Sequence, residues 1–564
     1  MAMAKRRVGR LDVLRALARR GLGPTLLRLR HEAWVRLGGP TRALADRPPP
    51  SGPFLAPPAA PLVLDPPVLA RLLAGADAAA RLPDWTSGRP DADAPWHTID
   101  PYAHGDIRLL WETSRFAALP VLALAARASG SPRFLAAAEA HLAGFLAACP
   151  PFRGPHWASA QEAAIRLIHL TAAWIILGGT TEGGRALAAL LADRVRATLT
   201  YERALANNHG IVCAAALAGA GALLGTADHG LGVRLLAADL PRLTTAAGGF
   251  AQVSTRYHRM ALDALAFASL AGAALPDSVR ARATAMARWL ARVTDPATGR
   301  APRLGHDDGT ALLDAACAGP EDARPALGRA AAAFGDPAEP VLALAGLGPT
   351  PGPPAPEIWT DAEGGTAGIT TRSAIALMRL PGGRFPAGQA DILHLSLMHR
   401  GAEVLRDAGT WLYNPPAGEA DLAGTAHHST AQWDEEDRPP RLARFLFAAP
   451  PRLHALETGP GTLRAACDRH DRTVAVAGDI WTITDRVAPG ATLRWRLPAG
   501  TWLRQPDGVE GASAAIAVTA EGPIDLRLGQ GWDSPRYGVR ERIPVLTLRL
   551  GTATQIVTTR VRLA

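Results

Sequence analysis

The chain has 564 residues, 48% of them hydrophobic, which is enough for two to four domains with large cores. Cys149, Cys213, Cys317 and Cys467 are far apart and form no CxxC pair, which excludes a zinc knuckle and a disulfide framework. The net charge is +9, yet residues 48–564 contain 48 basic and 48 acidic side chains, so the sequence shows no basic patch for a nucleic-acid partner.

Residues 1–47 contain the whole basic surplus, with 12 Lys and Arg against 3 Asp and Glu. Basic residues recur through Arg20, so no uninterrupted apolar stretch follows the charged start as it does in a signal peptide. We expect a protein of the cytoplasm or the membrane periphery, with the periplasm left open. This arm is either a solvated basic helix or a helix lying on an anionic membrane. In the second case its apolar side comprises Leu11, Val13, Leu14, Leu17 and Leu22.

The arm continues into a proline-rich stretch up to residue 67, which predicts an extended linker. Over residues 68–345, Ala and Leu recur at helical spacing, as in "AQEAAIRLIHLTAAWIIL", and short Gly, Pro and Asp loops separate the blocks. The pattern predicts an all-α region of seven or more antiparallel helices.

A second stretch rich in proline and glycine, "GLGPTPGPPAPEIW", ends the helical pattern. Over residues 357–564 the apolar period becomes two, as in "WTITDRV" and "PVLTLRL". Many short alternating segments separated by turn residues predict an antiparallel β-sandwich. The predicted fold class is therefore a multidomain α+β protein, with an all-α domain followed by a β-sandwich.

Two polar groups interrupt the apolar helices. Glu112 and Arg115 are spaced i, i+3 on one helix face, which is typical of a surface ion pair but also of a polar helix end that faces a ligand. Asn207, Asn208 and His209 are consecutive, and three adjacent polar side chains are costly to bury without partners. The two amides either cap a helix that begins at the next residue or bind a ligand.

A third polar group surrounds Tyr257, which is flanked by Arg256, His258 and Arg259. A single tyrosine on a helix more often serves packing. Nearby cations, however, favour the ionised phenol and lower its pKa, so we predict that Tyr257 is a base.

The strand-rich part has its own polar residues. Gln389 and Asp391 precede a predicted strand, and Asp407, His427 and His428 lie around strand ends and a loop. Histidines near an aspartate can be metal ligands or a proton donor. They can equally be loop residues with hydrogen bonds of their own.

In chain order, the motifs WExxR, ANNH, GGFxQxSxxYHR, GHDDG, QADxLHLxL, LRDAGTWLYN and AHHST resemble the heparinase II/III family of polysaccharide lyases over most of residues 95–450. The resemblance implies an (α/α) toroid, incomplete here, followed by a β-sandwich. It also implies β-elimination, in which the C5 proton of a uronic acid is removed and the 4-linked oxygen is expelled. Such a site needs donors for the carboxylate, a base and an acid.

The resemblance gives roles to residues at matching positions. Asn208 and His209 match the donors, Tyr257 matches the base, and His428 matches the histidine of the family's "AHNT" loop, expected to serve the leaving oxygen. The substrate-binding residues we predict are Glu112, Arg115, Asn207, His258, Arg259 and Gln389.

A metal is the least certain part of this resemblance. Many members have an HxHAD stretch whose second histidine joins an aspartate and the loop histidine around zinc; the counterparts here are Gln389, Asp407 and His428, and Ala387 stands at the first histidine. Glutamine is a poorer zinc ligand than imidazole, so a zinc or other divalent ion would rest on Asp407 and His428. His394 is either a substitute ligand or a satisfied core histidine, and we favour the latter.

The leading hypothesis is a polysaccharide lyase, a carbon–oxygen lyase acting on an acidic, uronate-containing bacterial polysaccharide and tied to surface polysaccharide metabolism. One alternative is a non-catalytic glycan-binding or assembly protein on a lyase fold. Another is a glycoside hydrolase, which needs two carboxylates flanking the bond; Glu112 and Asp407 are the available acids.

Overall fold

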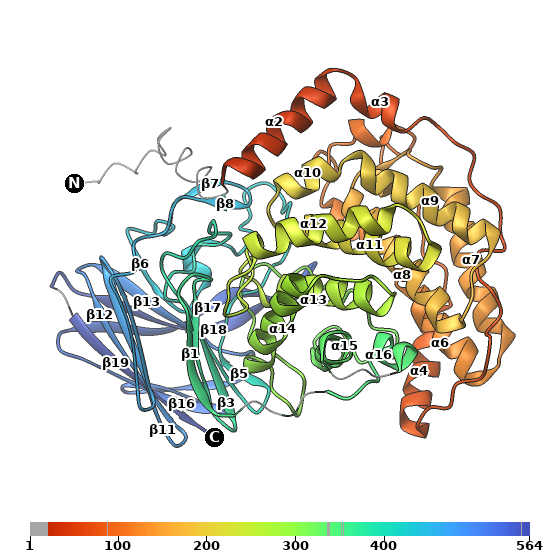
Figure 1. The fold of residues 1–564 in the computed structure, drawn as a ribbon. Helices are drawn as coiled ribbons and strands as arrows, with labels where there is room; N and C mark the ends of the chain where they lie inside the picture. The colour runs from red at the N-terminus through yellow and green to blue at the C-terminus, as the bar shows by residue number, and fades with distance from the viewer. Residues whose placement is uncertain (1–20, 87, 336–338, 351, 353–354, 554) are drawn as a thin grey trace.

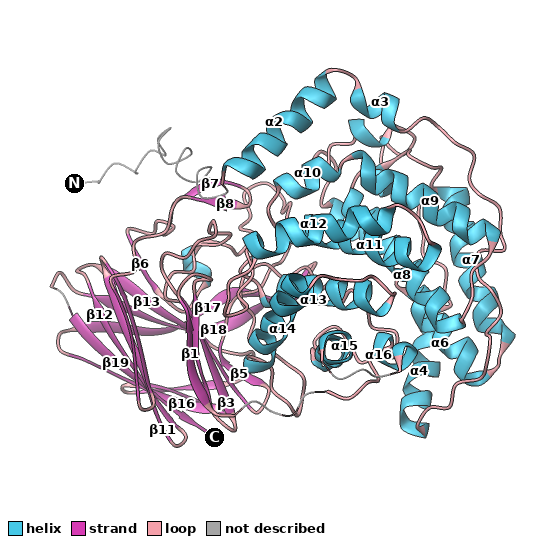
Figure 2. Cartoon of the chain, in the orientation of Figure 1, coloured by secondary structure: helices cyan, strands magenta, loops and turns pink. Residues whose placement is uncertain are grey.

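The computed structural model describes residues 21–86, 88–335, 339–350, 352, 355–553 and 555–564. Helices fill the first part of the chain and strands the second (Figures 1 and 2). The helices are α2 (Leu22–Arg36), α3 (Gly39–Ala43), α4 (Pro66–Ala79), α5 (Ile107–Glu112), α6 (Ala118–Ser129), α7 (Pro132–Ala148), α8 (Ala160–Leu177), α9 (Glu182–Ala197), α10 (Leu199–Ala204), α11 (Asn208–Leu224), α12 (Asp228–Leu243), α13 (Thr255–Leu270), α14 (Asp277–Arg292), α15 (Arg324–Phe334) and α16 (Pro340–Leu344), with 3₁₀ turns η1 (Trp96–Thr98), η2 (Pro155–Trp157) and η3 (Thr425–His427).

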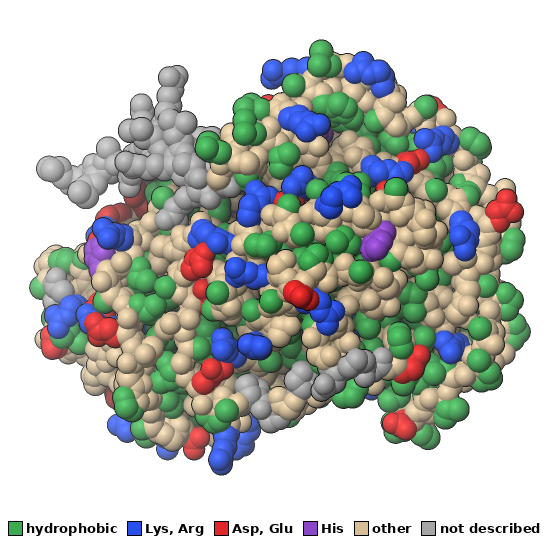
Figure 3. Space-filling model, in the orientation of Figure 1, with side chains coloured by type: hydrophobic (Ala, Val, Ile, Leu, Met, Phe, Trp, Pro, Cys, Tyr) green, Lys and Arg blue, Asp and Glu red, His purple; other side chains and the backbone are tan. Residues whose placement is uncertain are grey.

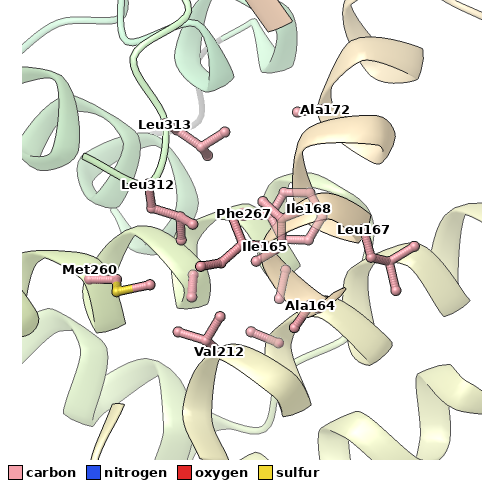
Figure 4. Close-up of a cluster of buried hydrophobic side chains, with 14 of the residues drawn as sticks. Ala164, Ile165, Leu167, Ile168, Ala172, Val212, Met260, Phe267, Leu312 and Leu313 are labelled. Carbon is pink, nitrogen blue, oxygen red and sulfur yellow. The ribbon is translucent and has the colours of Figure 1, made fainter. Parts of the chain in front are cut away.

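The long helices form successive pairs around one core. Helices α4, α6, α8, α11, α13 and α15 each pack against the next, while α7, α9, α12 and α14 pack on α6, α8, α11 and α13. Where α8, α11 and α13 meet, Ile165, Ile168, Val212 and Phe267 pack together with Leu312 of a loop (Figure 4). Alanine-rich faces allow this close packing, and they leave the central helices almost wholly buried.

Helix α8 is the one helix in the described part of the chain that is long and apolar enough to cross a membrane, and 94% of it is buried within the protein. Ser159 caps its N-terminus by accepting a hydrogen bond from the backbone of Glu162, and Gly178 ends it with a positive φ of 85°. The burial is that of a core helix.

The strands form antiparallel sheets. The five-stranded sheet has the order β1-β2-β3-β4-β5, the eight-stranded sheet β14-β15-β16-β19-β12-β11-β10-β9, the four-stranded sheet β17-β18-β13-β6, and β7 pairs with β8. Their bounds are β1 (Glu357–Asp361), β2 (Thr366–Thr370), β3 (Ala374–Arg379), β4 (Leu395–His399), β5 (Ala402–Leu405), β6 (Ala431–Trp433), β7 (Arg441–Ala443), β8 (Leu446–Phe447), β9 (Ala455–Gly459), β10 (Thr462–Cys467), β11 (His470–Ala477), β12 (Ile480–Val487), β13 (Ala491–Arg496), β14 (Trp502–Gln505), β15 (Gly508–Gly511), β16 (Ala514–Ala520), β17 (Ile524–Arg536), β18 (Val539–Leu550) and β19 (Gln555–Leu563).

One apolar core joins the three large sheets. Alternate residues of β12, among them Trp481 and Ile483, are buried there with Trp495 of β13 and Val561 of β19. This is the burial pattern expected when one face of each sheet packs on another sheet. The segment "RLARFLFA" (residues 441–448), whose apolar alternation predicts a single strand, forms the short hairpin of β7 and β8 instead.

The two parts share apolar and polar contacts. Trp359, Leu377 and Phe385 of the strand-rich part belong to the same buried cluster as the helical core. Trp289 of α14 packs edge-on against Trp359, with ring centroids 6.1 Å apart.

The structure describes only part of the predicted N-terminal arm. Leu11, Val13, Leu14 and Leu17 lie outside the described residues, whereas Leu22 is the first residue of α2.

Candidate active site

Tyr257 lies at the start of α13. Ser254 caps this helix, because its hydroxyl accepts a hydrogen bond from the Tyr257 backbone at 3.0 Å and donates one to the carbonyl of His306 at 2.6 Å. The Tyr257 side chain is buried, and its hydroxyl hydrogen-bonds to the hydroxyl of Tyr413. Burial and the Asp308 carboxylate raise the pKa of Tyr257 well above its usual value.

The basic neighbours of Tyr257 do not lower its pKa, which corrects the prediction from the sequence. Arg256 binds Asp307 at 2.9 Å, and His258 stacks on Trp289 with ring centroids 4.5 Å apart. Arg259 is buried and donates to a loop carbonyl at 2.7 Å. Successive residues of a helix point about 100° apart, so these side chains leave the phenol. His258 and Arg259 thus have partners within the protein, and their predicted contact with substrate stays a prediction.

The charges close to the phenol come from α5, from the segment that follows it, and from the loop before α15. Arg108 contacts Asp308 at 2.7 Å, and Arg115 binds both oxygens of Glu162 at 2.6 and 2.7 Å. Although burial opposes ionisation, the two guanidinium groups hold the pKa of Asp308 below its usual range. Arg115 is buried and its guanidinium group is bound by Glu162, and its predicted contact with substrate stays a prediction.

Glu112 has the most exposed side chain of the predicted substrate contacts, at 56%. It pairs with Arg108 at 2.5 Å and with Arg115 at 3.4 Å. It also borders a cavity of about 480 Å³ whose wall includes His169 and Asp314. The sequence left two interpretations of Glu112 open, a surface ion pair and a polar helix end. In the structure Glu112 is both.

The three consecutive polar residues have three different environments. Asn207 is the N-cap of α11, which begins at Asn208 and not at the expected Gly210, and its side chain accepts from the His209 backbone at 3.0 Å. Asn208 is buried; its amide nitrogen donates to the sulfur of Met260 at 3.3 Å and its oxygen has no partner among the described residues.

His209 is partly exposed, and its Nδ1 contacts Glu202 of α10 at 2.8 Å. Met260, which receives the Asn208 amide, lies one turn after Tyr257 on α13. The structure thus brings Asn208, His209 and Tyr257 to the first turns of two adjacent helices. Asn207 caps the helix, and its predicted role as a substrate contact stays a prediction.

Tyr413 is a site residue that sequence reasoning missed, although it lies within the quoted "GTWLYN" stretch. Its backbone nitrogen donates to Asp106 at 2.7 Å, and the nitrogen of Asn414 donates to the same oxygen at 2.9 Å. The hydroxyl of Tyr537 donates to that oxygen too, at 2.7 Å. Asp106 of the helical part thereby fixes the loop that presents Tyr413 to Tyr257.

His306, in the "GHDDG" motif, is a second missed residue. Its buried ring packs edge-on against Tyr413 and Phe445, with centroids 5.6 and 5.7 Å away. The Gly388 backbone lies close enough to interact with the imidazole. A Cβ atom built on Gly388 would lie 3.7 Å from the ring. An imidazole of the helical part therefore lies beside residue 388, between Ala387 and Gln389.

Gln389 and Asp391 are both buried. Neither amide atom of Gln389 has a hydrogen-bond partner in the described structure. Asp391 faces Arg379 at 3.4 Å. Gln389 is thus a polar side chain beside the His306 loop, and its predicted contact with substrate stays a prediction.

His428 and Asp407 form a buried pair, 3.1 Å apart, inside the strand-rich part. Although burial opposes it, the Asp407 carboxylate raises the pKa of His428, and His428 lowers the pKa of Asp407 to about 2. His428 is thus paired with Asp407 in the interior of the strand-rich part, and its predicted catalytic role stays a prediction. Asp407 also accepts from the Gly409 backbone at 2.7 Å, so the pair anchors the loop that leads to Tyr413.

The same pair, with His394, is the one cluster of potential metal ligands found among the described residues. The Ser429 backbone donates to Nδ1 of His394 at 2.9 Å, so the ring proton is on Nε2, which donates to Ser396 at 2.9 Å. His394 therefore has no free lone pair. Nδ1 of His428 is hydrogen-bonded to Asp407, so Nε2 of His428 and the Asp407 carboxylate are the donors left among these three residues. The residues as arranged do not fit a zinc site, and His394 is the satisfied core histidine.

The comparisons agree with this architecture. Residues 379–559 match the family model described as Heparinase II/III-like, C-terminal. The chain is similar to heparinase III, with a TM-score of 0.61 and 15% identity over 96% of this chain and 92% of that one. It is similar to the heparan sulfate lyase HepC from Pedobacter heparinus, with a TM-score of 0.53 and 16% identity over 93% and 87% of the two chains.

A third similar structure is the chondroitin AC lyase of Streptomyces coelicolor A3 in complex with chondroitin sulphate, with a TM-score of 0.51 and 16% identity over 88% of this chain and 80% of that one. No curated protein matches the sequence. The predicted fold class, a helical toroid followed by an antiparallel β-sandwich, is confirmed. Residues 379–559 are thus similar to the C-terminal domain of the heparinase II/III family, and together with the helical region they form the fold of these lyases.

Proposed function

We propose that this protein is a polysaccharide lyase that cleaves an acidic, uronate-containing polysaccharide by β-elimination. The observation that supports it best is the hydroxyl pair of Tyr257 and Tyr413 beside the first turn of α11. A phenol held at a helix start, next to an amide and an imidazole, provides a base and donors in one place.

In the proposed reaction the Tyr257 oxygen takes the C5 proton of the uronate. The electrons of the C5–H bond form the C4–C5 double bond, and the bond from C4 to the linking oxygen breaks. Asn208 and His209 stabilise the carboxylate as negative charge moves onto it. The Nδ1 of His209 faces Glu202, which directs the other ring nitrogen toward a ligand.

The leaving oxygen needs a proton, and Nδ1 of His428 is already hydrogen-bonded to Asp407 at 3.1 Å. The two tyrosine hydroxyls can deliver this proton, because Tyr257 acquires one in the first step and Tyr413 is hydrogen-bonded to Tyr257. Tyr413 also stabilises the phenolate by donating to it, which offsets part of the effect of burial. The same two hydroxyls therefore serve both proton transfers.

The hydrolase alternative finds less support. Asp407 is fully buried against His428, so it does not flank a glycosidic bond together with Glu112. The glycan-binding alternative keeps one observation in its favour, which is that Ala387 and Gln389 stand where many members of the family have two histidines.

The test is absorbance of the unsaturated uronate while the full chain is incubated with heparan sulfate, chondroitin sulfate, alginate and uronate-rich bacterial surface polysaccharides. We expect a rise with at least one polymer, and its loss in the Tyr257→Phe variant while polymer binding persists. New reducing ends without absorbance would show hydrolysis. Binding without either product would show a glycan-binding protein.

A further inference from the structure

Helix α2 presents its apolar residues to solvent. The side chains of Leu22, Leu26, Leu29 and Leu37 are 83%, 64%, 58% and 71% exposed. Their spacing of four, three and eight residues places them, with Ala33, along one stripe of a helix. A helix that only packed on its own core would turn such a stripe inward.

The rest of α2 is fixed to the protein, so the stripe cannot rotate inward. Pro24 is buried, and the ring of His31 packs against that of Tyr201 on α10, with centroids 5.0 Å apart. Arg28 lies over the same tyrosine ring at 4.8 Å. The contacts of α2 with α10 thus hold the opposite face outward, at the upper edge of the molecule in Figure 1.

The edges of the stripe are basic. Arg30 and Arg36 are exposed on its two sides, and Arg42 is exposed just beyond. The one acid of the helix, Glu32, is bound to Arg28 at 2.8 Å. Figure 3 shows basic and hydrophobic side chains together over this edge of the molecule. An apolar stripe flanked by arginines matches the boundary between lipid head groups and acyl chains.

We infer that α2 docks the protein on an anionic membrane, with the leucine stripe (Leu22, Leu26, Leu29 and Leu37) in the acyl boundary and Arg30 and Arg36 against lipid phosphates. At 15 residues the helix is about 22 Å long, too short to span a bilayer core of about 30 Å, so it lies along the surface.

A bilayer suits the leucine stripe better than a second copy of the chain does. Pairing two stripes face to face would bring the arginines of both copies together without acids to neutralise them. Four leucines on one helix also supply less than the roughly 800 Å² per partner of a stable interface. Lipid phosphates complement these charges.

Docking through α2 would place the proposed active site close to the membrane. Helix α10, on which α2 packs, carries Glu202, and Glu202 contacts His209. One short helix therefore separates the leucine stripe from the proposed site, although the docking itself does not depend on that site being active.

The experiment is flotation of the full chain with vesicles of phosphatidylcholine alone or mixed with phosphatidylglycerol. We expect binding to the anionic vesicles, weakened about tenfold or more in the L22S/L26S/L29S variant, because three leucines lose their burial. Replacing Arg30 and Arg36 with Glu should remove the preference for anionic lipid, and salt should weaken wild-type binding.

The matched control is L82S/L503S, which changes two other exposed leucines, 53% and 62% exposed, and should bind like wild type. Circular dichroism should be unchanged in every variant, since all these positions are at the surface. Three outcomes would overturn the inference: no vesicle binding, binding that survives the triple serine change, or a dimer in solution that the triple change dissociates.

Discussion

Asn207 and Asn208 are neighbours in sequence, yet their amides have different partners. The Asn207 side chain satisfies a backbone nitrogen at the start of α11, as N-caps do. The Asn208 oxygen is buried without a partner, and its nitrogen faces only a sulfur atom. Because the sulfur of Met260 is a weak hydrogen-bond acceptor, the Asn208 amide nitrogen stays available for a substrate carboxylate.

The two asparagines therefore make a matched pair of variants. Asn207→Ala should lower the free energy of unfolding by about 1 kcal/mol and leave turnover nearly unchanged. Asn208→Ala should lower kcat/KM by a factor corresponding to about 3 kcal/mol, with little loss of stability. Thermal unfolding and steady-state kinetics on the cleaved polymer measure both. The reverse pattern would make Asn208 a structural residue only.

The raised pKa of Tyr257 leads to a prediction about how turnover depends on pH. Burial and Asp308 hold its pKa above the usual value, so the phenolate is scarce at neutral pH and becomes more abundant as pH rises. The logarithm of kcat/KM should increase by about one per pH unit toward alkaline pH. Tyr413→Phe should lower the whole profile because it removes a donor to the phenolate, whereas Tyr201→Phe should not. A profile flat across neutral pH would exclude Tyr257 as the free base.

At the scale of elements, Asp106 joins α5 to the loop that carries Tyr413. One carboxylate oxygen caps α5 at the Arg108 backbone, 2.9 Å away, and the other accepts from two loop nitrogens and from Tyr537. A single side chain thus sets the position of the Tyr413 loop relative to the helix behind Tyr257.

Asp106→Ala should destabilise the protein by about 3 kcal/mol, because a cap is lost and buried donors are left unpaired. Turnover should fall with it, and amide exchange should increase at Tyr413 and Asn414. Asp100→Ala is the control, since Asp100 makes a comparable turn contact with the Tyr102 backbone, at 2.9 Å, on the surface. Equal effects of the two changes would contradict a special role for Asp106.

At the scale of the whole molecule, folding buries neutral histidines. Burial lowers the pKa of His156 and of His258 to about 4 each, and both rings are hydrogen-bonded to protein groups. In the unfolded chain a histidine has a pKa of about 6.5. The unfolded state therefore takes up protons first as the pH falls.

The stability contributed by these groups is complete above about pH 6.5 and is lost as the pH falls toward 4. Each histidine should contribute up to about 1.4 kcal/mol per pH unit to the slope. Urea unfolding at a series of pH values measures it, and His258→Gln should reduce the slope by one proton. A stability that stays constant over this pH range would contradict the neutral, buried state.

The sequence by itself determined the order of helices and strands, because apolar period is a local property. The change from period 3.6 to period two lies where the structure passes from α16 to β1. Tyr257, Asn208 and His209 were also identified from local pattern and family motifs. The hairpin of β7 and β8 was missed because a single apolar run does not show its turn.

Only the tertiary structure decided which side chains surround the phenol. Tyr413 is 156 residues from Tyr257 in sequence, and no local rule connects them. Conversely, His258 and Arg259 adjoin Tyr257 in sequence, but each helical residue turns about 100°, so they point into packing. The direction in which each side chain points decides whether it belongs to the site. That direction is set by the rotation of the helix and by the loop anchored on Asp106.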